Sequence, residues 1–298
     1  MQITGYCRFS YFGISDTGKA VQTEADAHQL LYNEDRMATR FHLFENLTAP
    51  SILHQSDPDF RFVVITSTIL PDPYMTRLKA IVASVPQMEL LVTDNRDLTK
   101  VLRPMIKSIG ASGLLPTLSF RLDDDDAVSV NYIARLRALA ERLEPNTIIS
   151  FPKGLLAFTH GVGKFGENFR EYHACGFARY NRAGDFRDPF ALQHKQEYKR
   201  LPSYMDPGFH AYIYSAHGHN NTKVGSGADS GMIARYLRNN PELVDATSLA
   251  PAEAALGRGF PYLTPERLKA ILIDSATVGF DPHRPLPESL RLHEPVAA

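Results

Sequence analysis

The chain has 298 residues, of which 44% are hydrophobic and 22% are charged, and 32 basic residues nearly balance 33 acidic ones. These proportions are ordinary for a globular protein and exclude a disordered, collagenous or coiled-coil chain. A dedicated nucleic-acid binder would carry a basic excess, so we expect no nucleic-acid partner.

The signals of cellular compartment are few but consistent. The two cysteines, Cys7 and Cys175, are too few for a disulfide framework or a four-cysteine zinc site and fit a reducing compartment. The N-terminus lacks the pattern of a signal peptide, and no apolar run approaches the roughly 18 residues that a membrane span needs. We therefore expect a cytoplasmic protein with no transmembrane segment, while peripheral contact with a membrane stays open.

The first half of the chain alternates strand patterns with helical patterns. Strands are expected at residues 3–9, 60–66, 88–92 and 118–122, and helices at residues 24–47, 73–84 and 129–143. This alternation predicts an α/β fold with a Rossmann-like, mostly parallel sheet. In such sheets ligands bind at the carboxyl ends of the strands.

The second half has a different character. Residues 151–219 contain 6 of the 11 histidines and more than a third of the Phe and Tyr residues. We expect a smaller, loop-rich half of antiparallel strands that carries a binding surface and no second hydrophobic core. The side chains expected on this surface are Tyr198, Tyr204, Tyr212 and Tyr214.

The end of the chain is expected to be helical. A helix that Asp229 or Ser230 caps should stop near Pro241, and Thr264 with Pro265 has the pattern of a second helix start. The proline-rich residues 281–298 are expected to form a surface tail.

Four adjacent aspartates, Asp123 to Asp126, follow the strand at residues 118–122. Adjacent carboxylates repel one another, and their oxygen atoms suit Mg²⁺ or Mn²⁺. Because side chains alternate along a strand, Asp123 and Asp125 should point one way and Asp124 and Asp126 the other. A solvated acidic turn is the plain alternative, and an EF-hand is unlikely because its glycine and its final glutamate are missing.

Basic residues near this cluster have several interpretations. Arg8, at the end of the first strand, suits a nucleotide phosphate or base, because the guanidinium fork matches phosphate geometry. Arg121 is expected to be a counter-ion of the aspartates. Arg36 and Arg40 lie four residues apart on one helix face, and a solvated or salt-bridged face is the favoured reading. Lys223 could neutralise a phosphate, although a loop lysine is more often solvated.

The order of these motifs resembles a known group of enzymes. Residues 49–65 are similar to the S-[LI]-x-x-Q helix end and apolar strand of GT-A-fold glycosyltransferases, and residues 119–127 to their D-x-D strand end. Arg8-Phe9-Ser10, Arg121 to Ala127 and His217-Gly218-His219-Asn220 resemble a bacterial rhamnosyltransferase family. The resemblance covers most of residues 3–222. It departs at Thr66-Ser67, where many GT-A enzymes have an acidic pair, and in lacking Q-x-x-R-W.

This resemblance implies a fold and a reaction. The fold would be a single GT-A-like domain over residues 1–280, with a nucleotide-sugar half at 1–145 and an acceptor half at 146–280, followed by the tail at 281–298. The reaction would be metal-dependent transfer of a sugar, in its narrower form a rhamnosyl group, from a nucleoside-diphosphate sugar donor to a saccharide or glycolipid acceptor.

The resemblance also implies roles for particular residues. Mn²⁺ or Mg²⁺ would be held by Asp123, Asp125, Asp126 and His217, with His219 as the second histidine candidate. The nucleotide sugar would contact Arg8, Asp123, Asp124 and Lys223. An inverting enzyme needs a general base, for which Asp206 is the candidate among Asp185, Asp188, Asp206 and Asp229.

Two alternatives from other functional classes stay open. One is a metal-dependent phosphohydrolase, in which Asp124, Asp126 and Val128 would form a D-x-D-x-V motif of the haloacid-dehalogenase type, although that motif normally follows the first strand. The other is a non-catalytic module that binds carbohydrate or a cation.

Overall fold

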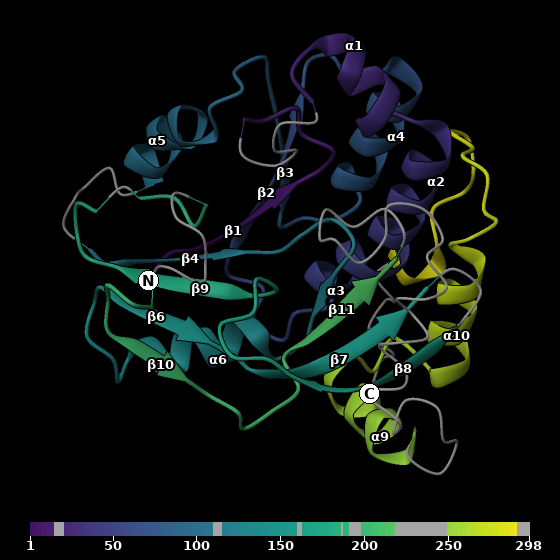
Figure 1. Ribbon diagram of the computed structural model, residues 1–298. Helices are drawn as coiled ribbons and strands as arrows, with labels where there is room; N and C mark the ends of the chain where they lie inside the picture. The colour runs from purple at the N-terminus through teal and green to yellow at the C-terminus, as the bar shows by residue number, and fades with distance from the viewer. Residues whose placement is uncertain are drawn as a thin grey trace, which may run out of the picture.

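The computed structural model describes residues 1–14, 21–109, 115–159, 163–185, 187–190, 198–217 and 249–290. In this part of the chain, seven strands form one large sheet in the order β10-β6-β9-β4-β1-β2-β3. The strands are β1 (Ile3–Arg8), β2 (Arg61–Ser67), β3 (Met88–Thr93), β4 (Thr117–Arg121), β6 (Thr147–Ser150), β9 (Phe177–Asn181) and β10 (Ser203–Met205). Figure 1 shows this sheet beside a smaller one.

The large sheet is mostly parallel, as the sequence predicts. Strand β1 pairs in parallel with β2 and β4, β2 with β3, and β6 with β10, whereas β9 runs antiparallel between β4 and β6. The register sets Tyr6 opposite Arg121 and Arg8 opposite Ile65. The carboxyl ends of β1, β2 and β4 therefore meet at one edge, where a ligand is expected.

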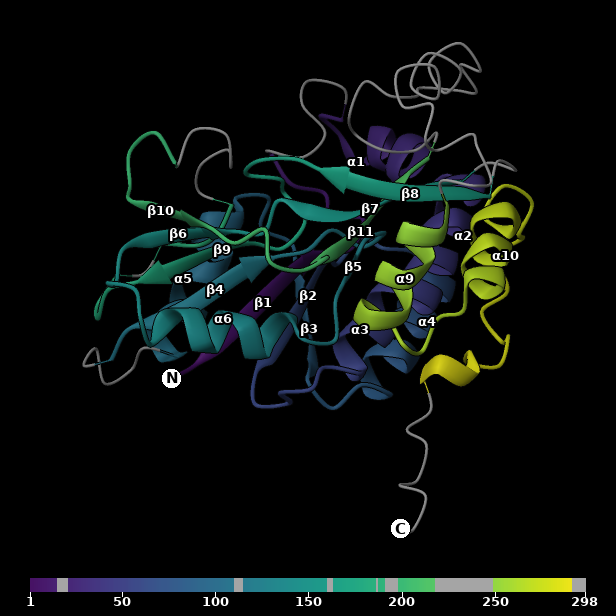
Figure 2. The ribbon, with the colours of Figure 1, turned by 90° about the horizontal axis from the view of Figure 1, so that it is seen from below.

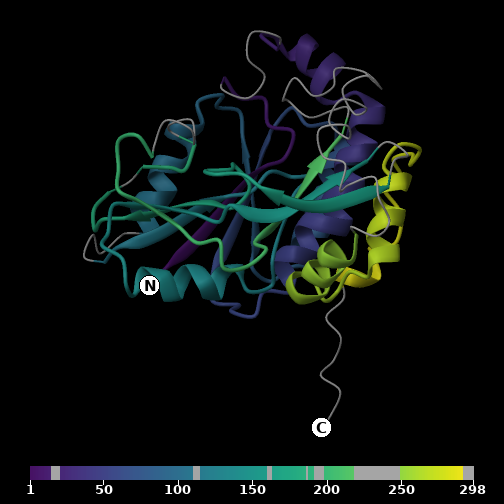
Figure 3. The same cartoon turned by 60° about the horizontal axis from the view of Figure 1, so that its bottom comes forward.

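Helices cover both faces of this sheet. Buried side chains of α2 (Glu34–Leu43), α3 (Ala49–Leu53), α4 (Asp72–Ala83) and α6 (Tyr132–Ala140) pack on one face. Helix α5 (Leu98–Ile109) packs on the other, against Tyr6, Val63 and Ile65. Figure 3 shows α5 and α6 on opposite sides of the sheet. The predicted α/β layering is thus confirmed.

The second sheet has the order β5-β11-β7-β8. Its strands are β5 (Ala127–Val128), β7 (Lys153–Phe158), β8 (Lys164–Phe169) and β11 (Tyr212–Ala216). Strand β5 follows β4 through the aspartates, and β7 follows β6 after two residues. The aspartates therefore lie where the two sheets adjoin.

One expectation for the second half is confirmed in part and another is wrong. Strand β7 pairs antiparallel with β8, β11 with β5 and β9 with β6, but β11 with β7 and β10 with β6 pair in parallel, so this half is antiparallel only in part. It also has its own core, because α9 (Leu249–Gly259) and α10 (Pro265–Asp274) bury apolar side chains against β7, β8 and β11. Figure 2 shows both helices beside these strands. The sequence did not reveal this core because its strands are short, and a short apolar run has no periodicity that identifies it.

The expected helix at residues 24–47 is divided into four pieces. These are α1 (Glu24–Asp26), the π-helical η1 (Ala27–Leu31), α2, and the π-helical η2 (Phe44–Thr48). A π-helical turn shifts the faces of a helix and is frequent at functional sites. Arg36 and Arg40 of α2 face inward, where they are 8% and 5% exposed.

The C-terminal segments confirm one expectation and correct another. Thr264 caps α10, its Oγ1 accepting a hydrogen bond from the backbone nitrogen of Arg267 at 3.1 Å. The beginning of the expected surface tail packs on the domain instead: the short helix η5 (Glu288–Leu290) buries Leu290, and Ser289 O lies 3.0 Å from His54 Nε2. The helix expected near residues 229–240 lies outside the described residues.

Candidate functional site

The four aspartates form a turn and not a strand. They lie between β4 and β5, and the backbone nitrogen of Asp126 donates to Asp123 O at 3.3 Å. The expected alternation of side-chain direction is therefore wrong, because it holds for an extended strand and not for a turn. Asp124, Asp125 and Asp126 are 1–3% exposed, which also excludes a solvated acidic turn.

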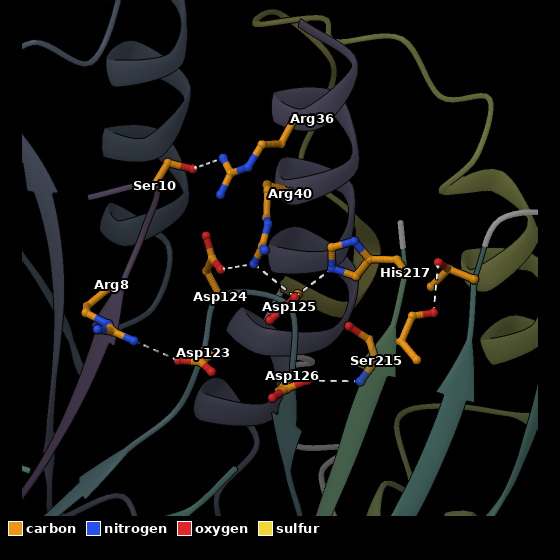
Figure 4. Close-up of polar contacts among 12 residues, drawn as sticks. Arg8, Ser10, Arg36, Arg40, Asp123, Asp124, Asp125, Asp126, Ser215 and His217 are labelled. Atoms are coloured by element: carbon orange, nitrogen blue, oxygen red, sulfur yellow. Dashed lines mark hydrogen bonds and ion pairs between the residues drawn. The ribbon is translucent and has the colours of Figure 1, made fainter. Parts of the chain in front are cut away.

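Arg40 joins two of these carboxylates. Its Nη1 lies 2.5 Å from Asp124 Oδ1 and 2.9 Å from Asp125 Oδ2, and all three side chains are buried (Figure 4). Burial raises the pKa of Asp124 and of Asp125, and Arg40 acts against this effect. The guanidinium group thus supplies the positive charge that adjacent buried carboxylates require.

Strand β11 brings His217 and Ser215 to the same turn. His217 Nε2 lies 2.6 Å from Asp125 Oδ2, and the Ser215 backbone nitrogen donates to Asp126 Oδ1 at 2.9 Å. Burial, followed by the charge of Asp125, raises the pKa of Asp126 well above its usual range. The expected grouping of His217 with Asp125 is what the structure has.

Arg8 and Arg121 converge on the fourth carboxylate. Their Nη2 atoms lie 3.7 and 3.2 Å from Asp123 Oδ1, and their guanidinium carbons lie 4.5 and 4.9 Å from the centre of the Phe190 ring. Burial by itself would raise the pKa of Asp123, but Arg121 and Arg8 outweigh it and hold the value at about 2. The Asp123 side chain is 36% exposed, so this basic pair flanks a carboxylate that a ligand can reach.

Arg36 is buried one helical turn before Arg40. Its Nη1 donates to Ser10 Oγ at 2.9 Å and to Leu31 O at 2.7 Å. Burial, followed by the charge of Arg40, lowers the pKa of Arg36 to about 10. The favoured reading was a solvated or salt-bridged face: Arg40 is salt-bridged, but both arginines are buried, so a solvated face is wrong. Their spacing of four residues was visible in the sequence, but the direction of that helix face was not.

Two hydroxyl groups occupy the place of the acidic pair of many GT-A enzymes. Thr66 Oγ1 donates to Phe9 O at 2.9 Å, and Ser67 Oγ accepts from the Phe12 backbone nitrogen at 2.8 Å. Both side chains therefore anchor the loop that follows β1. This loop holds Ser10, whose φ of 44° is in the left-handed region.

The donor set of the site can be compared with what Mn²⁺ or Mg²⁺ requires. Asp125 Oδ2 lies 2.6 Å from His217 Nε2 and 2.9 Å from Arg40 Nη1. One oxygen of each neighbouring aspartate is also engaged, that of Asp124 by Arg40 and that of Asp126 by the Ser215 backbone nitrogen. Among the described residues, no three His, Cys, Asp or Glu side chains form a complete metal cage. Mg²⁺ is commonly held by one or two side chains together with substrate phosphates. The described residues by themselves therefore leave the donor set incomplete, and a metal ion at this site stays a prediction.

The candidate base is not part of this cluster. Asp206 follows β10, three strands and roughly 14 Å across the sheet from β4. Its carboxylate lies 3.5 Å from Arg135 Nε and accepts from the Gly208 backbone nitrogen at 2.8 Å. Its role as base stays a prediction. Lys223, His219 and Asp229 lie outside the described residues.

The tyrosines expected on an acceptor surface have different surroundings. Tyr212 is wholly buried, and its hydroxyl bonds to Pro152 O and Asn168, so its assignment to a surface was wrong. Tyr204 is 41% exposed. Tyr198 stacks on Tyr172 at 4.1 Å between ring centres, and Tyr214 contacts the ring of His173.

Comparison with known proteins defines the class of protein. Residues 2–229 match the model of the family described as "Putative rhamnosyl transferase", whereas a search of curated proteins found no match. The match spans most of the chain and includes the aspartate turn and His217. The protein is a glycosyltransferase. It belongs to this rhamnosyl transferase family, as the resemblance implied.

Solved structures show weaker similarity. The Staphylococcus aureus protein TarS, residues 1–349, has 12% identity and a TM-score of 0.39, with 91% of this chain and 83% of that chain covered. The same protein with UDP-GlcNAc has 9% identity and a TM-score of 0.39, with 91% and 70% covered. A mannose-1-phosphate geranyltransferase from Thermus thermophilus has 10% identity and a TM-score of 0.25, with 72% and 74% covered. In the described part of the chain, no helix has the length and apolar character of a membrane span.

Proposed function

We propose that the protein transfers a sugar from a nucleoside-diphosphate sugar to a hydroxyl group of a saccharide or glycolipid acceptor, in a reaction that depends on Mn²⁺ or Mg²⁺. Rhamnose is the donor sugar that the family description favours. The observation that carries the proposal is the meeting of Asp125 and His217 at 2.6 Å, beside Arg40, at the carboxyl edge of the parallel strands.

Asp125 and His217 are the side chains that would hold the ion. When bound, the ion would act as a Lewis acid that neutralises charge on the departing nucleoside diphosphate. His217 must be neutral to serve as a ligand. Arg40 keeps Asp125 oriented and compensates its charge, so the carboxylate is ready before substrate arrives.

The basic pair at Asp123 would recognise the nucleotide. Arg8 and Arg121 are held against the Phe190 ring, which limits their movement, and guanidinium groups bind phosphate oxygens through paired hydrogen bonds. The exposed Asp123 carboxylate can accept hydrogen bonds from ribose hydroxyl groups. Its low pKa keeps it ionised for this role.

The environment of Asp124 disfavours the phosphohydrolase. That reaction would need Asp124 as a nucleophile that forms a phosphoaspartate. Asp124 is 3% exposed and its Oδ1 is ion-paired with Arg40 at 2.5 Å. A nucleophile must reach its substrate, and here the guanidinium group stands in the way.

A binding and hydrolysis assay tests the proposal. The protein is offered a panel of UDP-, GDP- and dTDP-sugars with and without Mn²⁺, and nucleotide binding and slow donor hydrolysis are measured. We expect one base to bind in a metal-dependent manner, and Asp125→Asn to abolish this dependence. Asp59→Asn, at a side chain 89% exposed, is the matched control. The proposal fails if no nucleoside diphosphate binds in the presence of metal.

A further inference from the structure

Two arginines of α2, one helical turn apart, differ in their direct contacts with the aspartate turn. Arg40 contacts two carboxylates at 2.5 and 2.9 Å. Arg36 makes no ion pair with any described residue; its hydrogen bonds go from Nη1 to the neutral atoms Ser10 Oγ and Leu31 O. Both side chains are nevertheless buried, Arg36 being 8% exposed. Asp124 and Asp125 also favour the charged form of Arg36, but no ion pair joins either of them to Arg36, whereas both pair directly with Arg40.

A buried cation whose nearest carboxylates form no direct ion pair with it is less well compensated than one that contacts them. Replacing a buried charged group by a neutral one is often neutral or stabilising, so stability alone does not explain Arg36. Its Nε and Nη2 have no hydrogen-bond partner among the described residues, and Figure 4 shows its guanidinium group between Ser10 and the aspartate turn. An anionic ligand would accept hydrogen bonds from these two nitrogens.

Ser10 gives the same indication independently. It follows the carboxyl end of β1, where ligands of parallel sheets bind, and its φ of 44° is unusual for a residue other than glycine. Such backbone strain is concentrated at functional sites. Because Ser10 Oγ accepts the bond from Arg36, its own proton is available to a second acceptor, for example a phosphate oxygen.

We propose that Arg36 and Ser10 form a phosphate-binding subsite that receives the diphosphate of the donor. This inference rests on the proposed function and identifies the residues that hold the charge of the leaving group. The free edge of the Arg36 guanidinium and the Ser10 hydroxyl would contact the phosphate oxygens. Arg40 cannot take this role, because Asp124 and Asp125 already engage it.

The test compares Arg36→Gln with Arg40→Gln. Calorimetric titration with UDP, GDP, dTDP, the corresponding nucleosides and inorganic pyrophosphate, each with Mn²⁺, measures binding, and thermal unfolding measures stability. We expect Arg36→Gln to weaken binding of the nucleoside diphosphate and pyrophosphate by roughly 10- to 100-fold, the effect of losing charged hydrogen bonds. Binding of the nucleoside and the melting temperature should stay near wild type. Arg40→Gln should instead lower the melting temperature.

Each other result has a defined meaning. Wild-type affinity of Arg36→Gln for the diphosphate would overturn the subsite, and so would an equal loss of nucleoside binding. A change confined to the KM of an acidic acceptor would assign Arg36 to the acceptor and would also overturn it. If the wild-type protein binds no nucleoside diphosphate, the proposed function itself fails. Should Arg36→Gln not fold, Arg36→Lys and Ser10→Ala serve in its place, with weaker diphosphate binding expected for both.

Discussion

His217 Nε2 lies 2.6 Å from Asp125 Oδ2, although the two residues are 92 positions apart in the chain. Strand β11 ends at Ala216, directly before His217, and pairs antiparallel with β5, which begins directly after the aspartates. The strand pairing alone therefore carries the histidine to the turn. The contact between His217 and Asp125 therefore lies where the large sheet and the small sheet adjoin.

The first prediction concerns His217. His217→Ala should weaken Mn²⁺ binding in the presence of nucleoside diphosphate by about tenfold or more, the size of effect found when groups around a metal are removed. Titration followed by the electron paramagnetic resonance signal of Mn²⁺ measures this. His54→Ala is the matched control, because its ring nitrogen lies 3.0 Å from the Ser289 carbonyl oxygen and its ring stacks on Tyr262, and neither partner belongs to the aspartate turn. Equal Mn²⁺ affinity in both variants would exclude His217 as a ligand.

Arg40 should be the arginine on which stability depends most. Arg40→Met leaves Asp124 and Asp125 buried without their partner, which costs about 3–5 kcal/mol in the free energy of unfolding. Urea denaturation measures the change. Arg61→Met removes an exposed ion pair with Glu89, where Arg61 is 48% exposed, and should cost less than about 1 kcal/mol. Similar losses of unfolding free energy in Arg40→Met and Arg61→Met would contradict the prediction that the buried ion pairs of Arg40 contribute more to stability.

Asp126 should make stability depend on pH. Its folded-state pKa is raised above the unfolded value of about 4, so the folded protein binds more protons between these two pKa values. Stability must then fall as pH rises through that window. Asp126→Asn keeps an oxygen for the Ser215 backbone nitrogen and removes the charge. We expect this variant to melt higher than wild type at pH 7 and to lose the difference toward pH 4.

If the stability of wild type and of Asp126→Asn changed with pH in the same way, this assignment of Asp126 would be contradicted.

Asp123 is the opposite case, because its pKa is lowered to about 2. Its contribution to stability should be complete above about pH 4 and be lost as pH falls toward 2. Asp123→Asn should therefore be less stable than wild type at neutral pH, and the difference should vanish in acid.

Gly5 should be essential for the packing of the central strand. A Cβ atom there would lie 2.3 Å from Phe120 Cζ and 2.5 Å from Phe62 Cδ2. Gly5→Ala should lower the free energy of unfolding by about 1–3 kcal/mol, the usual cost of overpacking. Gly257 in α9 has no atom within 4 Å of the corresponding position, so Gly257→Ala should stabilise the protein by about 0.5–1 kcal/mol. Denaturation curves of the two variants show whether each is less or more stable than wild type.

The local properties of the chain were readable from the sequence. Apolar runs such as Phe62 to Ile65 specify buried parallel strands because both faces of such a strand are covered. Thr264 marks a helix start because its hydroxyl satisfies a backbone nitrogen there. The aspartate cluster was singled out because adjacent carboxylates repel one another, and His217 because of the resemblance to GT-A enzymes; the family match agrees with these motifs.

Only the tertiary structure decided which charges meet. The inward face of Arg36 and Arg40 depends on how α2 packs beside the aspartate turn, and the burial of Tyr212 depends on the packing of β11. Neither follows from local spacing, because periodicity shows that a helix has two faces and not which one faces the site. By itself the sequence determined the residue types and the order of the elements. The pairing of β11 with β5 and the packing of α2 then determined how four carboxylates are neutralised, because electrostatic energy depends on distances through space.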